Sequence, residues 1–465
     1  MKIVATVGPA STSPQIIKKL ILSGLNVARL NMAHGSHDEH SRRIDTVRAM
    51  ALQTRSAVGI LMDLPGPKLR VAKISGPSLE LKRNDEVFLT ANPLLQGKNI
   101  ITISYKDLIR DVKKNEAIYI SDGLIRVCVD GIQGEKIWCT VTHGGTVHVG
   151  AGVNFPHSML SMEAFTSTDK KHLEFGLKKG IDFVGISFVG NAGDIARVRR
   201  FCNERSKNPF IIAKIERAEA LDNLEKIIDA ADGVMVARGD LGIEVPFYKL
   251  PVIQNHIVNV ARQKGKPVIV ATQVLESMIQ NPRPTRAEAT DVATAISQGA
   301  DAIMLSGESA VGNYPVESVR ALTELIKETE RSDEFIFNPI AQKESEPKIV
   351  MAQEACRIAE KVNAKVILVQ TQTGRSALRI SRFRPRVPLL ALVDEERVRR
   401  RLTLFWGVQA LVKSIKVSIY HNTSLFRWLH KVYNFEQSDR AVLVDTPANS
   451  GKVVVSVIEG RSRKS

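Results

Sequence analysis

Charged side chains follow several apolar segments of the sequence at the point where each segment ends. The segment FIIAKIE at 210–216 ends on Lys214 and Glu216, and GVMVARGD at 233–240 ends on Arg238 and Asp240. Two carboxylates at neighbouring strand ends can share a hard divalent cation, because Mg²⁺ takes few protein oxygens together with substrate oxygens. The alternative is that each carboxylate forms a salt bridge with the cation two positions before it.

Further polar residues at segment ends indicate a site for a phosphorylated anion. Arg29 can bind phosphate through its planar guanidinium, and Lys214 can neutralise negative charge that develops during a reaction. Gly239 lies where a short helix is expected to begin, so backbone N–H groups there can hold a carboxylate or phosphate. The other polar ends are Thr6, Gly8, Asn31, His34, Asp63, Ser187, Thr272, Ser306 and Glu308. This set suits phosphoryl transfer, although neither a Walker-A motif nor a kinase glycine loop is present.

These ends become neighbours if the apolar segments form a closed parallel barrel. Segments rich in Ile and Val that lack strict alternation are typical of strands buried on both faces. Strands are expected at 2–8, 25–32, 57–64, 181–188, 210–216, 233–240, 266–273 and 301–308, with helical patterns between them. Eight such units fit an α/β fold of the (β/α)8 TIM-barrel type, in which catalytic groups lie at the carboxyl ends of the strands. A doubly wound open sheet is the structural alternative.

Two regions depart from the barrel pattern. Short alternating strands at 86–90, 117–121, 125–129 and 136–141 predict an all-β domain inserted in the third βα unit. A polar, proline-punctuated segment after Arg331 predicts a linker, and an open α/β pattern with an edge strand at 452–459 follows it. We therefore expect a barrel at 1–65 and 159–331, an inserted β-barrel-like lid at 66–158 and a C-terminal open α/β domain at 332–465.

The composition is that of a basic, globular chain. It has 65 Lys and Arg against 49 Asp and Glu, a net charge of +16, which usually reflects an anionic ligand or a solvated basic surface. Arginine is densest between Arg375 and Arg401, but no aromatic ladder or zinc finger accompanies it, so nucleic acid is not the expected partner. No segment has the ~18 apolar residues of a membrane helix, and MKIVATVGPA does not resemble a secretory signal. We expect a cytoplasmic protein that does not bind membranes.

Seven motifs resemble those of pyruvate kinases, and the resemblance extends over essentially the whole chain. They are ATVGPAS at 5–11, ARLNMAHGS at 28–36, MDLPGPKLR at 62–70, AKIE at 213–216, MVARGDLGIEVP at 235–246, ATQVLESMIQNPRPTRAE at 271–288 and ADAIMLSGESAVGNYP at 300–315. The resemblance implies a barrel, a β-domain lid in its third unit and a C-terminal α/β domain. It also implies the last step of glycolysis, in which phosphoenolpyruvate phosphorylates ADP to give pyruvate and ATP.

The resemblance further assigns roles to the residues at matching positions. Glu216 and Asp240 would bind Mg²⁺ or Mn²⁺, and Lys214 would stabilise the enolate that remains when the phosphoryl group leaves. Arg29 would contact the transferred phosphate, and the substrate carboxylate would be bound by Gly239, Asp240 and Thr272. The water that protonates the enolate would lie near Thr272 and Ser306. The nucleotide would be bound by Asn31, His34, Arg70 and Asp122. Asp122 would approach the site when the lid closes, and closure would exclude water.

The chain departs from the family pattern near the expected monovalent-cation site. Potassium-dependent members hold K⁺ at positions corresponding to Asn31, Ala33, Asp63 and Leu64, and here alanine replaces a serine. Lys68 stands where those members carry glutamate, and an ammonium can supply the positive charge that K⁺ otherwise gives. We therefore expect no requirement for a monovalent cation; the alternative is that Lys68 points into solvent. Ala151 also stands where a lysine is common, which removes one basic contact to the nucleotide.

A phosphorylated regulator and a homotetramer are implied by the resemblance alone. The loop TQTGRSA follows an expected strand and begins a helix, so Thr371, Thr373, Gly374, Arg375 and Ser376 are candidate effector residues. An ordinary helix cap is the alternative. The final loop, DTPANSGK, looks shorter than the effector loop of the family, and the arginines at 379–401 are expected to serve that site or a subunit interface.

Two other functions remain open on the sequence. A barrel carbon–carbon lyase acting on phosphoenolpyruvate or pyruvate-like substrates would use the same carboxylates, but it would need neither the inserted domain nor Arg70. A regulatory or RNA-binding paralogue would explain the net charge of +16, but it would not need Lys214, Glu216, Asp240 and Thr272. An active pyruvate kinase accounts for all of these features.

Overall fold

The computed structural model describes residues 1–156, 158, 160–332, 346–412, 425, 428–430, 434–436, 438–445 and 453–459. Most of the predicted linker and most of the DTPANSGK loop lie outside the described residues. The chain divides into two compact units. The first contains residues 1–62, 178–184 and 258–465, and the second contains residues 63–177 and 185–257.

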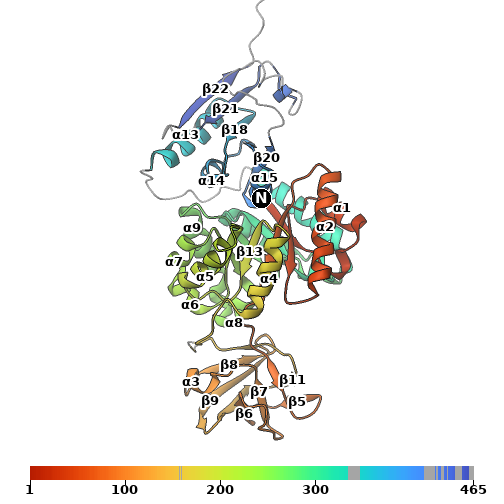
Figure 1. Ribbon diagram of the computed structural model, residues 1–465, viewed down its shortest axis with the longest axis vertical. Coiled ribbons are helices and arrows are strands. Elements are labelled where there is room, and N and C mark those ends of the chain that lie inside the picture. The colour runs from red at the N-terminus through yellow and green to blue at the C-terminus, as the bar shows by residue number, and fades with distance from the viewer. Residues whose placement is uncertain are drawn as a thin grey trace, which may run out of the picture. The chain divides into compact units, whose positions relative to one another are not determined.

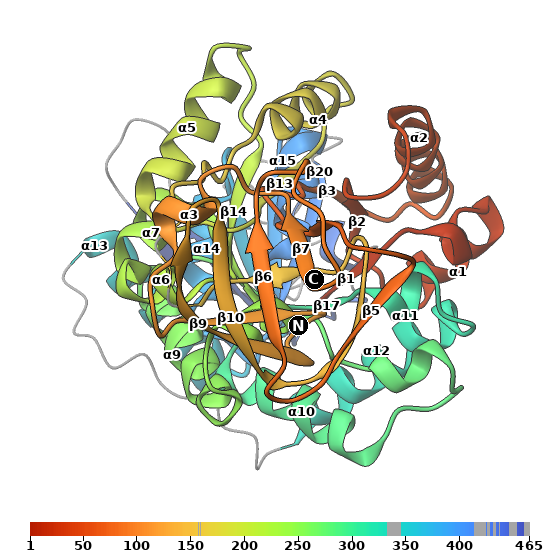
Figure 2. The same ribbon diagram turned by 90° about the horizontal axis from the view of Figure 1, so that it is seen from below.

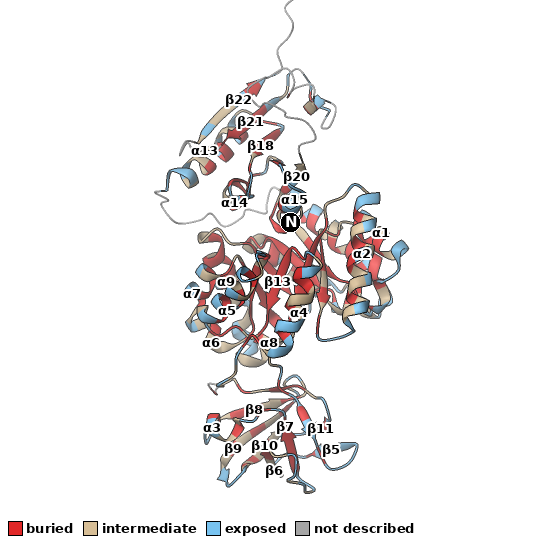
Figure 3. Cartoon of the chain, in the orientation of Figure 1, coloured by how far each residue is buried: buried red, intermediate tan, exposed pale blue. Residues whose placement is uncertain are grey.

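Eight strands form a closed parallel barrel in the order β1-β17-β16-β15-β14-β13-β3-β2. Their bounds are β1 Lys2–Thr6, β2 Val27–Asn31, β3 Gly59–Asp63, β13 Phe183–Ile186, β14 Phe210–Ile215, β15 Gly233–Ala237, β16 Val268–Ala271 and β17 Ala302–Leu305. All eight predicted strands are present, and the open-sheet alternative is wrong. Most strands end one to three residues before the end of the predicted segment, so several of the polar residues come after the strand. Figure 3 shows how completely a strand such as β13 is buried.

Helices follow the barrel strands, as the sequence pattern predicts (Figure 1). They are α1 Pro14–Leu22, α2 His37–Gln53, α4 Ser167–Lys178, α5 Ala192–Asn203, α6 Ala218–Asp222, α7 Leu224–Ala230, α8 Arg238–Glu244, α9 Leu250–Gln263, α10 Arg286–Gln298, α11 Gly307–Ala310 and α12 Pro315–Arg331. A capping box sets the start of α2: Glu39 N donates to Ser36 Oγ at 3.3 Å, and Ser36 N donates to the Glu39 carboxylate at 2.6 Å. Among the described residues, no helix combines the length and apolar character needed to cross a bilayer.

The inserted domain contains nine strands and one short helix, α3 Leu108–Asp111. The strands are β4 Val71–Lys73, β5 Ser78–Leu81, β6 Glu86–Thr90, β7 Ile100–Ile103, β8 Ala117–Ile120, β9 Ile125–Gln133, β10 Lys136–His143, β11 Gly145–His148 and β12 Val153–Asn154. Seven of them form one sheet, in which β9, β10, β6 and β7 run side by side (Figure 2). Alternate residues of β9 and β10 are buried, which is the pattern expected of a sheet with one face on a core.

The C-terminal region forms a five-stranded sheet in the order β20-β19-β18-β21-β22. Its strands are β18 Val366–Gln370, β19 Leu389–Val393, β20 Val408–Val412, β21 Arg440–Asp445 and β22 Val454–Glu459, and its helices are α13 Pro347–Lys361, α14 Arg375–Ser381 and α15 Glu396–Arg401. The last strand, β22, pairs antiparallel with β21 at the edge of the sheet. This confirms the predicted open α/β region with a terminal edge strand.

The arginine-rich segment binds barrel residues within the first unit. Both terminal nitrogens of Arg384 contact the Asp301 carboxylate, at 3.0 and 2.9 Å, and both side chains are almost completely buried. Arg400 Nε lies 2.9 Å from Asp182 Oδ1, and Arg382 Nη2 donates to the Gln263 carbonyl. These three arginines have partners within the same chain, and the expectation of an effector site or a subunit interface stays a prediction.

Removing the charge of Arg384 should destabilise the first unit. In Arg384→Met, Asp301 keeps its burial but loses its ion-pair partner, and breaking such a buried pair typically costs roughly 3–5 kcal/mol. Arg357→Met is the control, because Arg357 and its partner Glu354 are both exposed and such pairs contribute at most about 1 kcal/mol. The midpoint of urea unfolding measures both effects; equal shifts for the two variants would contradict the prediction.

Candidate active site

Lys214 is a buried ammonium held by the ends of three neighbouring barrel strands. Its Nζ lies 2.8 Å from Glu216 Oε1 and 3.1 Å from Asp63 Oδ1, and it donates to Ser187 Oγ at 2.6 Å. These groups follow or end β14, β3 and β13, which are adjacent in the barrel. Because only 9% of Lys214 is exposed, its charge requires close compensation, and the two carboxylates and the hydroxyl provide it.

Glu216 is the most buried charged group of this cluster. One carboxylate oxygen contacts Lys214, and the other accepts a hydrogen bond from Phe188 N at 2.7 Å. Phe188 has a φ of 55°, a strained value for a non-glycine residue of the kind that is concentrated at functional sites. Burial raises the pKa of Glu216; Lys214 opposes this shift and Asp240 adds to it. An additional cation would stabilise the ionised form of this carboxylate.

Asp240 lies in the first turn of α8, which starts directly after β15. Its Oδ1 is 3.7 Å from the Nζ of Lys68, and both side chains are partly exposed. The sequence offered salt bridges of Glu216 with Lys214 and of Asp240 with Arg238 as an alternative. The structure contains the first of these pairs, and it also contains an ion pair of Asp240 with Lys68. Lys68 thus contacts a carboxylate, and the alternative that it only extends into solvent is wrong.

In the first unit, Arg29 at the end of β2 contacts the end of β1. Arg29 Nη1 donates to Thr6 Oγ1 at 2.8 Å, and Thr6 Oγ1 in turn donates to the Leu305 carbonyl at 2.9 Å. This chain of hydrogen bonds fixes the guanidinium next to β1 and β17. The geometry suits a group that must present a planar pair of donors to an oxyanion.

Thr272 and Ser306 follow β16 and β17 in strained or unusual backbone conformations. Thr272 has a φ of 66°, and its hydroxyl donates to the Ala271 carbonyl at 2.6 Å. The Ser306 N–H donates to Glu308 Oε2 at 2.8 Å, whereas the buried Ser306 Oγ has no hydrogen-bond partner among the described residues. A buried hydroxyl without a partner is costly, so this oxygen is a candidate to bind a water or substrate.

The four predicted nucleotide residues are divided between the two units. In the first unit, Asn31 Oδ1 accepts a hydrogen bond from Ala33 N at 3.1 Å, and His34 is exposed. In the second unit, Arg70 Nη1 donates to the Gly150 carbonyl at 2.7 Å, whereas Asp122 is exposed and has a φ of 54°.

Asp122 approaches Lys68 in the second unit. A Cβ added to Gly152 would lie 3.4 Å from Asp122 Oδ1 and 3.7 Å from Lys68 Cε, so both side chains flank this glycine. A Cβ added to Gly123 would lie 3.7 Å from Ile243 of α8. The loop that carries Asp122 is thus next to the helix that carries Asp240.

The sequence did not assign a role to two groups that hold the cluster together. Ser187 was identified only as a polar strand end, yet its hydroxyl accepts from Lys214 and donates to the Leu64 carbonyl at 2.7 Å. The backbone N–H of Phe188 binds Glu216, and no feature of the sequence indicates its positive φ. The polar end Ser187, placed between two charged ends, was the only available signal.

The candidate effector loop contains a local turn that one side-chain hydrogen bond closes. Thr371 Oγ1 accepts a hydrogen bond from Gly374 N at 3.0 Å, and Gly374 has a φ of 86°. A Cβ at Gly374 would lie 3.0 Å from Leu402, which favours glycine there. Thr371 and Ser376 are buried, whereas Thr373 and Arg375 are exposed. Gly374 is the N-cap of α14, and no side-chain hydrogen bond caps this helix among the described residues. The helix-cap alternative is therefore not shown, and effector binding stays a prediction.

Comparisons with known proteins agree with this fold. The family described as "Pyruvate kinase, barrel domain" matches residues 1–319, and "Pyruvate kinase, alpha/beta domain" matches residues 350–454. A pyruvate kinase of Thermococcus litoralis is 42% identical over 414 residues, with 88% of this chain and 87% of that protein covered. A pyruvate kinase of Clostridium acetobutylicum is 40% identical over 416 residues, with 88% of each covered. A crystal structure of a pyruvate kinase from Cryptosporidium parvum has a TM-score of 0.92 at 32% identity, covering 99% of this chain and 96% of that one.

The barrel, its inserted domain and these matches define a phosphotransferase. The chain belongs to the pyruvate kinase family. The carbon–carbon lyase and the regulatory paralogue considered from the sequence are not supported by any of these comparisons.

Lys214→Met should fold but lose most of its turnover. The substitution keeps an unbranched side chain of similar length but removes the positive charge, and losing one well-placed electrostatic group typically costs about 3 kcal/mol, roughly a hundredfold or more in kcat. Lys226→Met, at an exposed lysine of α7, is the matched control and should leave kcat unchanged. Circular dichroism checks the fold. Near-normal turnover in correctly folded Lys214→Met would refute the assignment.

Proposed function

We propose that the chain transfers the phosphoryl group of phosphoenolpyruvate to ADP, giving pyruvate and ATP, in a reaction that depends on Mg²⁺ or Mn²⁺. The phosphorus–oxygen bond of phosphoenolpyruvate breaks, a bond to the terminal oxygen of ADP forms, and the enolate that remains takes up one proton. The observation that carries this proposal is the buried Lys214 between Glu216, Asp63 and Ser187, in a chain of the pyruvate kinase family.

The residues present fit a magnesium ion. Glu216 and Asp240 would hold it, and the raised pKa of Glu216, caused by burial, is the shift that a nearby cation would reverse. Among the described residues, no group of three or more His, Cys, Asp or Glu side chains could hold a metal by itself. This fits Mg²⁺, which commonly takes one or two carboxylates and completes its shell with substrate oxygens and water. When bound, the ion supplies positive charge to the substrate oxygens.

The chain's own residues would orient the donor and stabilise its negative charge. Arg29 would bind the transferred phosphate, and the N–H groups of Gly239 and Asp240, with the Thr272 hydroxyl, would bind the substrate carboxylate. Lys214 would stabilise the enolate, because its ammonium is fixed on one side of the cluster by three partners. A water near Thr272 and Ser306 would deliver the proton, a role that suits the unpartnered Ser306 Oγ.

The nucleotide would be held by Asn31, His34, Arg70 and Asp122. Arg70 and Asp122 belong to the inserted domain, so its closure would bring them to the nucleotide and exclude water from the reaction. The positions of Lys68 and Asp122 on either side of Gly152 support a closing movement that ends near α8. Ala151 in place of the usual lysine should weaken nucleotide binding.

We further propose that the enzyme needs no potassium. Lys68 has an ion pair with Asp240 at 3.7 Å, which supports an ammonium as the permanent substitute for a monovalent cation. Asp63 would then not need to hold a monovalent cation, because its carboxylate already contacts Lys214 at 3.1 Å.

We infer three broader properties from the family. These are a cytoplasmic location, a homotetrameric assembly and a phosphorylated regulator at Thr371, Thr373, Gly374, Arg375 and Ser376. The exposed aromatic residues Phe247 and Tyr248, together with exposed Val252 on α9, support a subunit interface.

One coupled assay tests the reaction. We expect pyruvate formation from phosphoenolpyruvate and ADP in the presence of MgCl₂, and its loss when EDTA removes the divalent ion. Denatured enzyme serves as the blank, and ATP formation is measured separately by luminescence. Absence of pyruvate formation by folded protein with Mg²⁺ would contradict the proposal.

Potassium should activate the wild-type enzyme less than about tenfold, a difference of about 1.4 kcal/mol in the barrier. The measurement compares turnover in tetramethylammonium buffer before and after addition of KCl. Lys68→Glu should become potassium-dependent, because it removes the ammonium beside Asp240 and adds a second negative charge. Lys73→Glu, at an exposed residue of β4, is the control for charge reversal in the inserted domain. Activation of the wild type by tenfold or more would count against the idea.

A further inference from the structure

The inserted domain joins the rest of the second unit through two chain segments that run side by side. Val153 N donates to the Leu69 carbonyl at 3.0 Å, and Val71 N donates to the Ala151 carbonyl at 2.9 Å. Leu69, Val153 and Phe155 belong to the hydrophobic core of the inserted domain. These two segments, 67–71 and 150–155, therefore form one hinge ribbon that moves with the inserted domain.

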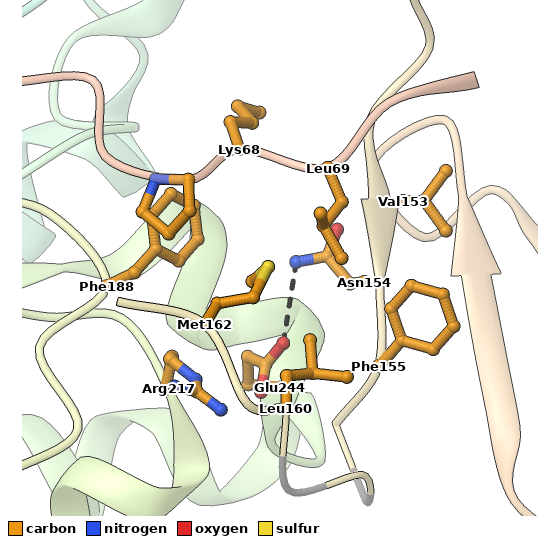
Figure 4. Close-up of a pocket in the computed structure, with 11 residues that line it drawn as sticks. Lys68, Leu69, Val153, Asn154, Phe155, Leu160, Met162, Phe188, Arg217 and Glu244 are labelled. Carbon is orange, nitrogen blue, oxygen red and sulfur yellow. Dashed lines mark hydrogen bonds between the residues drawn. The ribbon is translucent and has the colours of Figure 1, made fainter. Parts of the chain in front are cut away.

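The hinge ribbon faces the ends of β13, β14 and α8 across a small cavity. The cavity has a volume of about 30 Å³, and its lining includes Asn154 and Lys68 from the ribbon and Phe188, Arg217 and Glu244 from the barrel side (Figure 4). A polar cavity of this size has room for about one water. The ribbon and the barrel-side elements are thus not in full contact at this cavity.

One side-chain hydrogen bond crosses this cavity. Asn154 Nδ2 donates to Glu244 Oε1 at 3.4 Å, near the upper limit for such a bond (Figure 4). Glu244 is also bound from the barrel side, because Ala218 N donates to its carboxylate and Arg217 attracts it. Burial raises the pKa of Glu244; Arg217, Asn154 and Ala218 oppose this shift and Asp240 adds to it. The Glu244 carboxylate therefore contacts Ala218 and Arg217 on the barrel side and Asn154 of the ribbon.

The barrel-side partners of this bond are close in sequence to both carboxylates proposed to hold Mg²⁺. Glu244 is one helical turn after Asp240 on α8, so the two side chains lie on the same face of the helix. Arg217 directly follows Glu216. The ribbon also carries Lys68, whose ammonium contacts Asp240. A displacement of the ribbon must consequently change the Asn154–Glu244 and Lys68–Asp240 contacts together.

We propose that Asn154 and Glu244 form a hinge latch that holds the inserted domain in register with the carboxylates Glu216 and Asp240. Both are positioning residues: they act through the hinge ribbon and α8 and do not touch the reacting atoms. The effect on turnover rests on the proposed function, whereas the effect on the hinge itself does not. Breaking the latch should loosen the ribbon, weaken nucleotide binding and shift the Mg²⁺ requirement.

Adding a negative charge at Asn154 and then compensating it at Glu244 tests the latch. Asn154→Asp places a second carboxylate opposite Glu244, and repulsion should raise KM for ADP and the half-saturating Mg²⁺ concentration by roughly tenfold, with a smaller change in kcat. Adding Glu244→Gln supplies an amide donor to the new carboxylate and should restore both values to within about threefold of the wild type.

The matched control is Asn92→Asp, which makes the same change opposite Glu135 on the exposed surface of the inserted domain. It should leave KM for ADP, the Mg²⁺ requirement and the hinge unaffected. The urea midpoint of every variant is measured, so a loss of folding is recognised as such.

A second readout does not use activity. In the protein without metal or substrate, the backbone next to Lys68 and Arg70 is paired with segment 150–155, because Val153 N donates to the Leu69 carbonyl and Val71 N to the Ala151 carbonyl. Trypsin should cleave after Lys68 and Arg70 faster when this pairing opens, so the initial cleavage rate there reports the latch. We expect faster cleavage in Asn154→Asp than in Asn92→Asp, and a return towards the wild-type rate in the double variant. The latch is overturned if Asn154→Asp behaves like Asn92→Asp, or if Glu244→Gln does not reverse its effects. If the wild type lacks turnover but the variants differ in cleavage as expected, the proposed function is refuted and the latch is not.

Discussion

The burial of one positive charge, that of Lys214, is the constraint on which the site depends. Two carboxylates and a hydroxyl from three neighbouring strand ends compensate it, so the ends of β3, β13 and β14 are held together electrostatically as well as by the barrel. The compensation is more than complete, because two carboxylates face one ammonium and Asp240 adds further negative charge near Glu216. Burial is the first cause of the raised pKa of Glu216; Lys214 opposes this shift and Asp240 adds to it. The proposed divalent cation would relieve this unfavourable burial of negative charge.

Short elements connect this charge cluster to the hinge. Glu216 is followed at once by Arg217, and Asp240 and Glu244 occupy the same seven-residue helix, so neither carboxylate can shift without moving a group that faces the hinge ribbon. Phe188 completes the connection, since its N–H binds Glu216 and its side chain lines the hinge cavity. Phe188 has a φ of 55°, a strained conformation, and it has both the backbone hydrogen bond to Glu216 and the side-chain contact with the cavity. The groups that face the hinge ribbon are thus adjacent in sequence to Glu216 or on the same helix as Asp240.

The barrel and many of the candidate residues could be predicted because burial on both faces leaves a simple pattern in the sequence. Eight apolar segments gave eight strands, and the motifs around Lys214, Glu216 and Asp240 could be matched to a known family. The supporting contacts could not be predicted in this way. Arg384 and Asp301 are 83 positions apart, and Asn154 and Glu244 are 90 apart, so their pairing depends on tertiary packing that no local pattern encodes. Positive φ values at Phe188 and Thr272 are likewise set by the surroundings, since neither residue type favours that conformation.

The net charge of +16 shows why composition cannot identify a ligand by itself. Arg382, Arg384 and Arg400 lie in the densest basic segment, yet each is directed at a carbonyl or carboxylate of the barrel. Their charge contributes to the contact of the C-terminal region with the barrel. At the candidate site the balance is different: Lys214 and Lys68 contact three carboxylates, Glu216, Asp63 and Asp240. The proposal of an anionic phosphorylated substrate there thus depends on a divalent cation and on Arg29, which donates a hydrogen bond to the Thr6 hydroxyl.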